Sequence, residues 1–279
     1  MSPNRSHFGG SCAARISTLA TLRGRIERLE THDSAHRLNR VALGHAGADA
    51  MLQGGLARAS VHEVFAAGHQ SAAATGFIAA LAGRITAHRP LVWVRQDFTE
   101  IESGGLSMSG LAELGLDPRY LVTVRATDIE QALRTTADAL TCDAVGAVML
   151  EVWGESKQFD LVASRKLTLA AQASGVTCLV LRAAATPSPS TAETRWIVRA
   201  AHSPPAHLPA SAAGAWGAPR FDVELVRNRH GLVGRWIMEW KCDECLFSEP
   251  ETYPQPVAAA PAHRPHQAPA REQHQRRAG

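Results

Sequence analysis

Short continuous apolar runs alternate along most of the chain with segments in which apolar residues recur every three to four positions. Runs of the first kind are typical of strands buried on both faces, and spacing of the second kind is typical of helices. The predicted strands are Val61–Phe65, Leu91–Val94, Tyr120–Val124, Val145–Val152 and Val176–Leu181. The predicted helices are Gly76–Ile85, Asp128–Leu140 with Asp128 as its N-cap, and Leu161–Ser174, which Gly175 ends.

The pattern changes in the last third of the chain. Arg195–Arg199 predicts one more strand. Phe221–Arg227 and Val233–Trp240 then alternate apolar and polar residues with period two around a turn at 228–231, which indicates an antiparallel hairpin. We therefore predict an α/β protein, with a mainly parallel sheet flanked by helices and an antiparallel C-terminal hairpin added at the sheet edge.

An amphipathic segment precedes this core. Its apolar residues fall on one face of a helix, at Ile16, Leu19, Leu22, Ile26 and Leu29. That face packs either on the protein's own domain or on another subunit or partner, so the five residues are our candidates for partner binding.

The chain divides into three parts on these patterns. Residues 1–40 form an N-terminal helix and linker, and residues 41–247 form the core. Residues 248–279 are mostly Pro, Ala, His, Gln and Arg, with almost no large apolar side chain. We expect this tail to be disordered, because it buries too little surface to offset the entropy of ordering.

Composition limits the function classes. The 279 residues are 45% apolar, and the net charge of +3 is too small to indicate nucleic-acid binding by itself. Five scattered cysteines give no disulfide framework, which favours a reducing compartment. No apolar run approaches the ~20 residues of a membrane span, and the first ten residues show no signal-peptide pattern. We therefore expect a cytoplasmic protein without a membrane segment.

The strand, turn and helix over residues 61–75 have the setting of an ATP-binding phosphate loop. Such a loop needs glycines so that backbone N–H groups wrap the phosphates, a Lys that reaches the terminal ones, and a Ser or Thr for magnesium. Here the residues after Phe65 read Ala-Ala-Gly-His-Gln-Ser-Ala-Ala-Ala-Thr, and Lys is absent from residues 1–156. The chain therefore has the setting of this loop without its phosphate-binding side chains.

The approach to this loop resembles that of RecA recombinases. The matching residues are Leu43-Gly44, Asp49, Leu52, Gly54-Gly55-Leu56 and Arg58–Phe65. The likeness spans about residues 41–247 and implies a RecA-like P-loop NTPase core, in which Val145–Val152 corresponds to the Walker B strand. Phe221–Arg229 resembles a later RecA strand, with 233–247 as its hairpin partner.

In that alignment the degenerate phosphate loop runs from Ala66 to Ala73 and includes Gly68 and Ser71. Ala72 takes the place of the phosphate-binding Lys, and Ala73 takes the place of the Ser or Thr. A second register starts at Gly68 and brings Ala74 to the Lys position and Thr75 to the hydroxyl position. Neither register supplies the positive charge that phosphoryl transfer requires. We predict no catalytic residue, no cofactor and no metal, while residual binding through backbone N–H groups stays open.

Several polar residues follow the predicted strands. Glu151 occupies the place of a Walker B acid, where it either keeps a hydrogen bond at the sheet's C-terminal edge or binds magnesium. We expect four residues after the second strand to be surface residues near the former nucleotide cleft: Arg95, Gln96, Asp97 and Glu100.

Two further motifs have alternative interpretations. The segment 183–190 corresponds to RecA's second DNA-binding loop but holds no aromatic, Lys or Arg residue, so we expect direct DNA binding to be weak or absent. Cys242-Asp243-Glu244-Cys245 is half a zinc site, a redox dithiol or a plain strand end.

A closer resemblance is to the ImuA family of damage-inducible mutagenesis proteins, a degenerate RecA-like group. The residues that carry it are the entry from Leu43 to Val64, Gly110–Arg119, Leu140-Thr141, Val148–Trp153, Ser164–Leu167, Gly175–Thr177, Arg195-Trp196 and Leu225–Arg229. The resemblance implies work in SOS-induced translesion DNA synthesis. It also implies RecA, an inactive polymerase-like protein called ImuB, and an error-prone polymerase as partners.

We therefore predict a non-catalytic accessory protein that acts through protein contacts, by mimicking a RecA subunit. Two alternatives remain. One is a diverged ATPase that still hydrolyses slowly, which ATP titration would reveal. The other is a SulA-like inhibitor of cell division, which would co-purify with the division GTPase.

Overall fold

The computed structural model describes residues 39–86, 88–204 and 217–251. Its strands are β1 Arg40–Val41, β2 Leu56–Ala57, β3 Val61–Ala66, β4 Leu91–Gln96, β5 Leu121–Ala126, β6 Ala147–Trp153, β7 Thr177–Ala183, β8 Thr194–Ala200, β9 Arg220–Asn228, β10 Gly234–Lys241 and β11 Leu246–Ser248. Its helices are α2 Ala46–Met51, α3 Ser71–Thr86, α4 Asp97–Ser103, α5 Met108–Glu113, the short 3₁₀ helix η1 Pro118–Tyr120, α6 Ile129–Leu140 and α7 Leu161–Ser174. The proposed helix over residues 16–29 and the tail after residue 251 lie outside the described residues.

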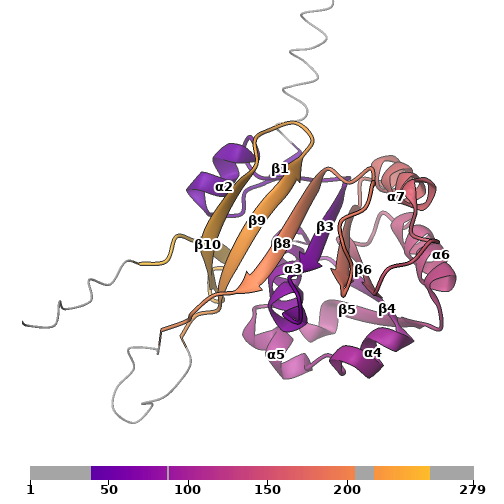
Figure 1. Ribbon diagram of the computed structural model, residues 1–279, viewed down its shortest axis with the longest axis horizontal. Helices are drawn as coiled ribbons and strands as arrows, with labels where there is room; N and C mark the ends of the chain where they lie inside the picture. Colours follow the sequence, from indigo (N-terminus) through magenta and orange to yellow (C-terminus); the bar gives the residue numbers. More distant parts are fainter. Residues whose placement is uncertain (1–38, 87, 205–216, 252–279) are drawn as a thin grey trace, which may run out of the picture.

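Nine of these strands form one sheet, in the order β11-β10-β9-β8-β3-β7-β6-β4-β5 (Figure 1). The six strands from β8 to β5 run parallel. The strands β9, β10 and β11 continue the sheet in antiparallel pairs. This arrangement confirms the predicted α/β class, with a mostly parallel sheet flanked by helices and an antiparallel C-terminal hairpin.

Helices cover both faces of the parallel strands. Met149 of β6 belongs to the hydrophobic cluster that α3 completes, whereas its neighbours Val148 and Leu150 belong to the cluster under α6 and α7. Consecutive side chains of a strand point to opposite faces, so α3 lies on one face and α6 and α7 lie on the other. Burial on both faces explains why the central strands read as continuous apolar runs.

Capping residues define the ends of α6 and α7. The Asp160 side chain accepts from the Ala163 amide at 2.8 Å, and Gly175 ends α7 with a φ of 78°. Asp128 caps α6 in the same way. The predicted bounds of α7 and the predicted N-cap of α6 are thereby confirmed.

Helix α3 begins five residues earlier than predicted, at Ser71 and not at Gly76. Alanine is the best helix former, so the run Ala72–Ala74 extends the helix toward the strand. Phe77 of this helix packs against Trp196, Phe221 and Phe247, with ring centroids 5.3–5.8 Å apart. This aromatic cluster joins α3 to the antiparallel end of the sheet.

Pattern reasoning also missed the small antiparallel sheet of β1 and β2, which lies outside the main sheet. Gly55 precedes β2 with a φ of 125°, and a Cβ there would stand 2.2 Å from the Val41 carbonyl oxygen. Only glycine fits this close approach of two backbones. Two-residue strands carry no periodicity, which is why the sequence gives no signal for them.

Candidate functional site

The connection between β3 and α3 forms the candidate site. Ala66 ends β3, four residues follow, and Ser71 begins α3. Gly68 has a φ of 55° and is exposed at the tip of this turn. The Ala67 amide donates to the Val198 carbonyl at 3.0 Å, and the Gln70 amide donates to the Ala67 carbonyl at 3.1 Å. Two amides of the turn are therefore committed to carbonyl groups of the protein.

The first turn of α3 presents backbone and methyl groups. The leading amides of any helix have no acceptor within the helix, so they are available to an anion. Ala72, which the RecA resemblance aligns with the phosphate-binding Lys, is exposed, and Ala73 packs partly against the core. The Gln70 side chain accepts from the Ala200 amide and ties the turn to the end of β8. An anion at this site would meet backbone amides of α3. Ala72 and Ala73 provide no positively charged side chain.

Glu151 is buried beside the core, and its carboxylate accepts hydrogen bonds. The side chain is 2% exposed, and its Oε2 accepts from Arg95 Nε at 2.7 Å and from Trp93 Nε1 at 3.0 Å. Arg95 and Glu151 face each other in the β4–β6 register. Glu151 shares its face of β6 with Met149, which is the face that α3 covers.

The expectation that Arg95 is a surface residue is wrong. It is 7% exposed, because the strand register places its guanidinium against the Glu151 carboxylate. Three other residues of this group are half-buried: Gln96, Asp97 and Glu100. The last two pair with Arg125 of β5, whose Nε is 2.8 Å from Asp97 Oδ1. These carboxylates are therefore paired at the sheet edge, and α4 holds them there.

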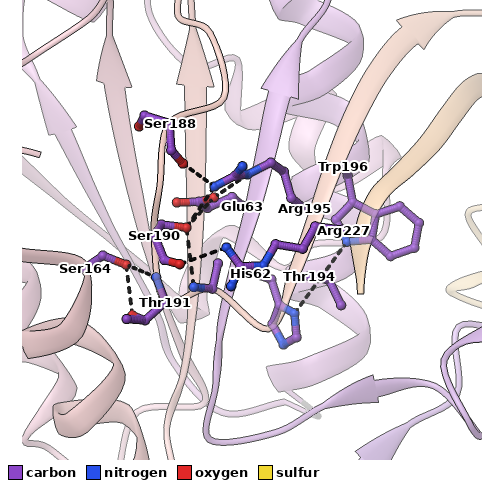
Figure 2. A network of polar contacts seen from close by, with 11 residues as sticks. His62, Glu63, Ser164, Ser188, Ser190, Thr191, Thr194, Arg195, Trp196 and Arg227 are labelled. Carbon is purple, nitrogen blue, oxygen red and sulfur yellow. Dashed lines mark hydrogen bonds and ion pairs between the residues drawn. The ribbon is translucent and has the colours of Figure 1, made fainter. Parts of the chain in front are cut away.

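A second buried network lies where β3 meets β8 (Figure 2). Glu63 and Arg195 are register partners, and Arg195 Nε donates to Glu63 Oε2 at 2.8 Å. The Ser190 hydroxyl donates to the same oxygen at 3.0 Å. Arg195 also donates to the Ser188 carbonyl, and Arg227 of β9 donates to the Ser190 carbonyl at 2.8 Å. Both cations that reach the 184–193 loop thus hold its backbone from within.

The other side of the same loop is fixed to α7. The Thr191 amide donates to Ser164 Oγ at 2.9 Å, and the Thr191 hydroxyl lies 2.7 Å from that of Thr168. This loop is the segment that resembles RecA's second DNA-binding loop. Its polar contacts are with the protein's own strands, with α7 and, through Thr186, with Glu155, so Arg195 and Arg227 serve as internal anchors.

His62 occupies a fully buried position next to Glu63. Its Nε2 lies 2.8 Å from the Ala57 carbonyl, which can only accept, so Nε2 carries the proton. Nδ1 then accepts from Thr194 Oγ1 at 2.8 Å, and that oxygen accepts from Trp196 Nε1. Burial lowers the pKa of His62 to about 4, with a further contribution from nearby Arg40. His62 is therefore a neutral structural residue.

Arg182 is the second-last residue of β7, which is buried along its whole length. It is 2% exposed, its guanidinium stacks on Phe159 at 4.6 Å, and Nη2 donates to the Gly154 carbonyl at 3.3 Å. Its Nε and Nη1 have no hydrogen-bond partner among the described residues. Burial is the main cause that lowers the pKa of Arg182, and the charge of Glu63 opposes it.

The CxxC motif forms the turn between β10 and β11. Cys245 has a φ of 51°, and its thiol contacts the Cys242 carbonyl. Burial and the charge of Asp243 raise the pKa of Cys242, which disfavours the reactive thiolate. The cysteines of the described ranges are free thiols, and no group of three or more metal-ligating side chains occurs within those ranges.

Sequence reasoning missed the role of Arg195 and Arg227. A signal for it exists, because Glu63 is an acidic residue in a strand whose other residues, apart from His62, are apolar. A carboxylate in such a strand requires a buried cationic or hydrogen-bonding partner. The sequence does not say which of the many arginines supplies it.

These features define an α/β protein consistent with a RecA-like core, in which the β3–α3 turn contains no lysine and the acid of β6 is paired with an arginine. Two curated relatives match it, the ImuA proteins of Caulobacter vibrioides strains NA1000 / CB15N and ATCC 19089 / CIP 103742 / CB 15. Each is 33% identical over 201 residues, which cover 67% of this chain and 77% of the relative. The chain belongs to the ImuA family. No protein-family model matches it, and no helix of the described ranges is long and apolar enough to cross a bilayer.

Proposed function

We propose that this protein is a non-catalytic accessory factor of SOS-induced, error-prone translesion DNA synthesis in the cytoplasm. It acts through contacts with RecA and with an ImuB-like polymerase homologue, and through the latter with an error-prone polymerase. Membership of the ImuA family and the RecA-like core support this role. The observation that carries its non-catalytic part is the exposed Ala72 at the head of α3, where a working phosphate loop has its Lys.

The mechanism is subunit mimicry. The RecA resemblance implies that ATP lies between neighbouring subunits, at the edge that holds the phosphate loop. Here that edge carries Gly68 and Ala72 at its surface, and the Glu151 carboxylate behind it is neutralised by Arg95. A copy with this edge can join or cap a RecA-like neighbour without an ATP-dependent switch. The apolar face of residues 16–29 is the second proposed contact.

Direct DNA binding has no part in this mechanism. A single-strand groove needs cations along the backbone and usually a stacking surface. Two arginines that contact the 184–193 loop, Arg195 and Arg227, are bound to Glu63 and to the Ser188 and Ser190 carbonyls. This arrangement supports recruitment to DNA through protein partners.

Capture of partners from damage-treated cells tests the proposal. The full chain should retain RecA and the ImuB-like protein, and a form without residues 1–30 should lose RecA. Leu22→Asp should weaken capture, whereas Arg23→Asp, a matched change off the apolar face, should not. Undiminished binding of both partners by the truncated form would rule out helix docking. Co-purification with the division GTPase in place of RecA would favour the SulA-like alternative.

A further inference from the structure

The free edge of the main sheet is unusually open. Strand β5 pairs with β4 on one side and has no strand on its other side among the described residues. Folded proteins usually protect such an edge with proline, lysine, a bulge or a very short strand. At the opposite edge, β11 has only three residues. β5 has six, Leu-Val-Thr-Val-Arg-Ala, with high β-propensity and without proline or lysine.

Apolar side chains are exposed along this edge, next to the exposed Thr123 and Arg125. Val122 of β5 is 50% exposed, and Tyr120, just before the strand, is 44% exposed. An edge that meets only water normally carries polar residues at such positions. The open backbone and the apolar side chains therefore coincide at one place.

An apolar projection lies at the C-terminal end of β5. Arg125 holds α4 there through Asp97 and Glu100. Ile101 follows Asp97 by one helical turn and is 76% exposed, and Phe98 is 46% exposed. Residues four apart share a helix face, so Ile101 stands on the side of α4 that meets the free edge.

A cavity of about 540 Å³ lies at the N-terminal end of the same strand. Apolar side chains from four segments line it: Leu91, Leu111, Leu116 and Leu121. Exposed Arg89 and the Arg84 guanidinium add positive charge on one wall, and Asp243 and Glu244 add negative charge on another. Two carboxylates of helix α4, Asp97 and Glu100, are paired with Arg125, and its third, Glu102, is exposed.

We propose that a second copy of this chain docks on this edge, with the two β5 strands antiparallel about a twofold axis. Antiparallel pairing of two identical strands brings the C-terminal end of each to the N-terminal end of the other. The exposed Ile101 of each copy therefore lies at the cavity of the other copy, and the twofold axis repeats this contact. The exposed Glu102 of α4 then approaches the wall that bears Arg84 and Arg89. Edge hydrogen bonds, apolar contact and charge all favour the same arrangement.

Sedimentation equilibrium of the full chain, from about 1 to about 100 µM, tests the proposal. The wild-type chain should pass from the mass of one chain to that of two. Val122→Lys should raise the dimer Kd at least about tenfold, because it places a charge on the paired edge. Leu169→Lys is the matched control, since Leu169 is an equally exposed apolar residue on α7, away from β5.

Gly83→Leu places a side chain in the cavity, and we expect the fold to accommodate it. A Cβ at Gly83 would lie 3.6 Å from Leu116, an ordinary contact, and leucine favours the helix more than glycine does. This variant should also raise the dimer Kd at least about tenfold while its thermal stability holds or rises. Dimers that withstand both Val122→Lys and Gly83→Leu would overturn the assignment to β5.

Hydrogen exchange on the wild-type chain locates the interface without any substitution. Amides of Leu121–Ala126 should become more protected as the concentration rises. A chain that stays monomeric at the highest concentration would overturn the proposal. Protection of β5 that is independent of concentration would do so too, because it would mean that a segment of the same chain covers the edge.

Discussion

Arg95 and Glu151 form an ion pair between two adjacent parallel strands, with Arg95 Nε 2.7 Å from Glu151 Oε2 and both side chains almost completely buried. The RecA resemblance places the Walker B acid at Glu151. A carboxylate whose negative charge is neutralised by a buried arginine attracts a magnesium ion less strongly. The pair therefore supports a scaffold role for this residue.

Breaking this pair should destabilise the fold strongly. Arg95→Ala leaves Glu151 buried without its counter-ion, so the free energy of unfolding should fall by about 3–5 kcal/mol in urea denaturation. Replacing both residues with apolar ones, Arg95→Met with Glu151→Leu, should recover most of the loss. Arg134→Ala, which breaks an exposed pair with Glu130, is the control and should change little. A cost for Arg95→Ala no larger than that control would contradict the prediction.

The buried His62 should make stability depend on pH. Its pKa of about 4 in the folded chain lies below the ordinary 6.5, so the unfolded chain binds more protons between these values. The contribution is complete above pH 6.5 and is lost as the pH falls toward 4. Between pH 7 and 5 the free energy of unfolding should drop by roughly 2 kcal/mol from this group alone. His62→Gln should flatten that slope in urea denaturation, and an unchanged slope would assign the effect to other groups.

Magnesium-ATP should not bind the wild-type chain in the micromolar range. The turn after β3 commits two of its amides to carbonyls, and Ala72 offers no charge. Ser71→Gly with Ala72→Lys and Ala73→Thr restores the side-chain chemistry in the same strand–helix frame. Titration calorimetry should show it binding at least about tenfold more tightly than wild type. Micromolar binding by the wild-type chain, lost in Glu151→Gln, would instead favour the weak-ATPase alternative.

Removing Arg195 should release the 184–193 loop. Arg195→Ala leaves Glu63 buried without its cation and frees the Ser188 carbonyl, so limited proteolysis should cut within this loop. We expect a loss of about 3 kcal/mol in the free energy of unfolding. Arg199→Ala, four residues further on β8 with a half-exposed partner, should leave the loop resistant. Equal cleavage of the two variants would show that other contacts hold the loop.

Local chemistry made several features of the fold predictable. Asp160 and Gly175 set the two ends of α7, and each acts only on residues close to it in the chain. The apolar runs of β3, β6 and β7 reflect burial on both faces of the sheet. The helix start at Ser71 was predicted five residues late, because alanines carry no periodic pattern. The absence of a long apolar run and the resemblance to the ImuA family were likewise visible in the sequence alone.

The sequence by itself determined that residues 66–75 contain no lysine, because the identity of each side chain is fixed before the chain folds. Only the tertiary structure decided what the charged residues of the core do. Arg95 and Glu151 are 56 positions apart, and Glu63 and Arg195 are 132 apart. Strand order and register bring each pair together, and a one-residue change of register would send these side chains to opposite faces. Periodicity identifies strands, but the choice of neighbours depends on packing of the whole sheet.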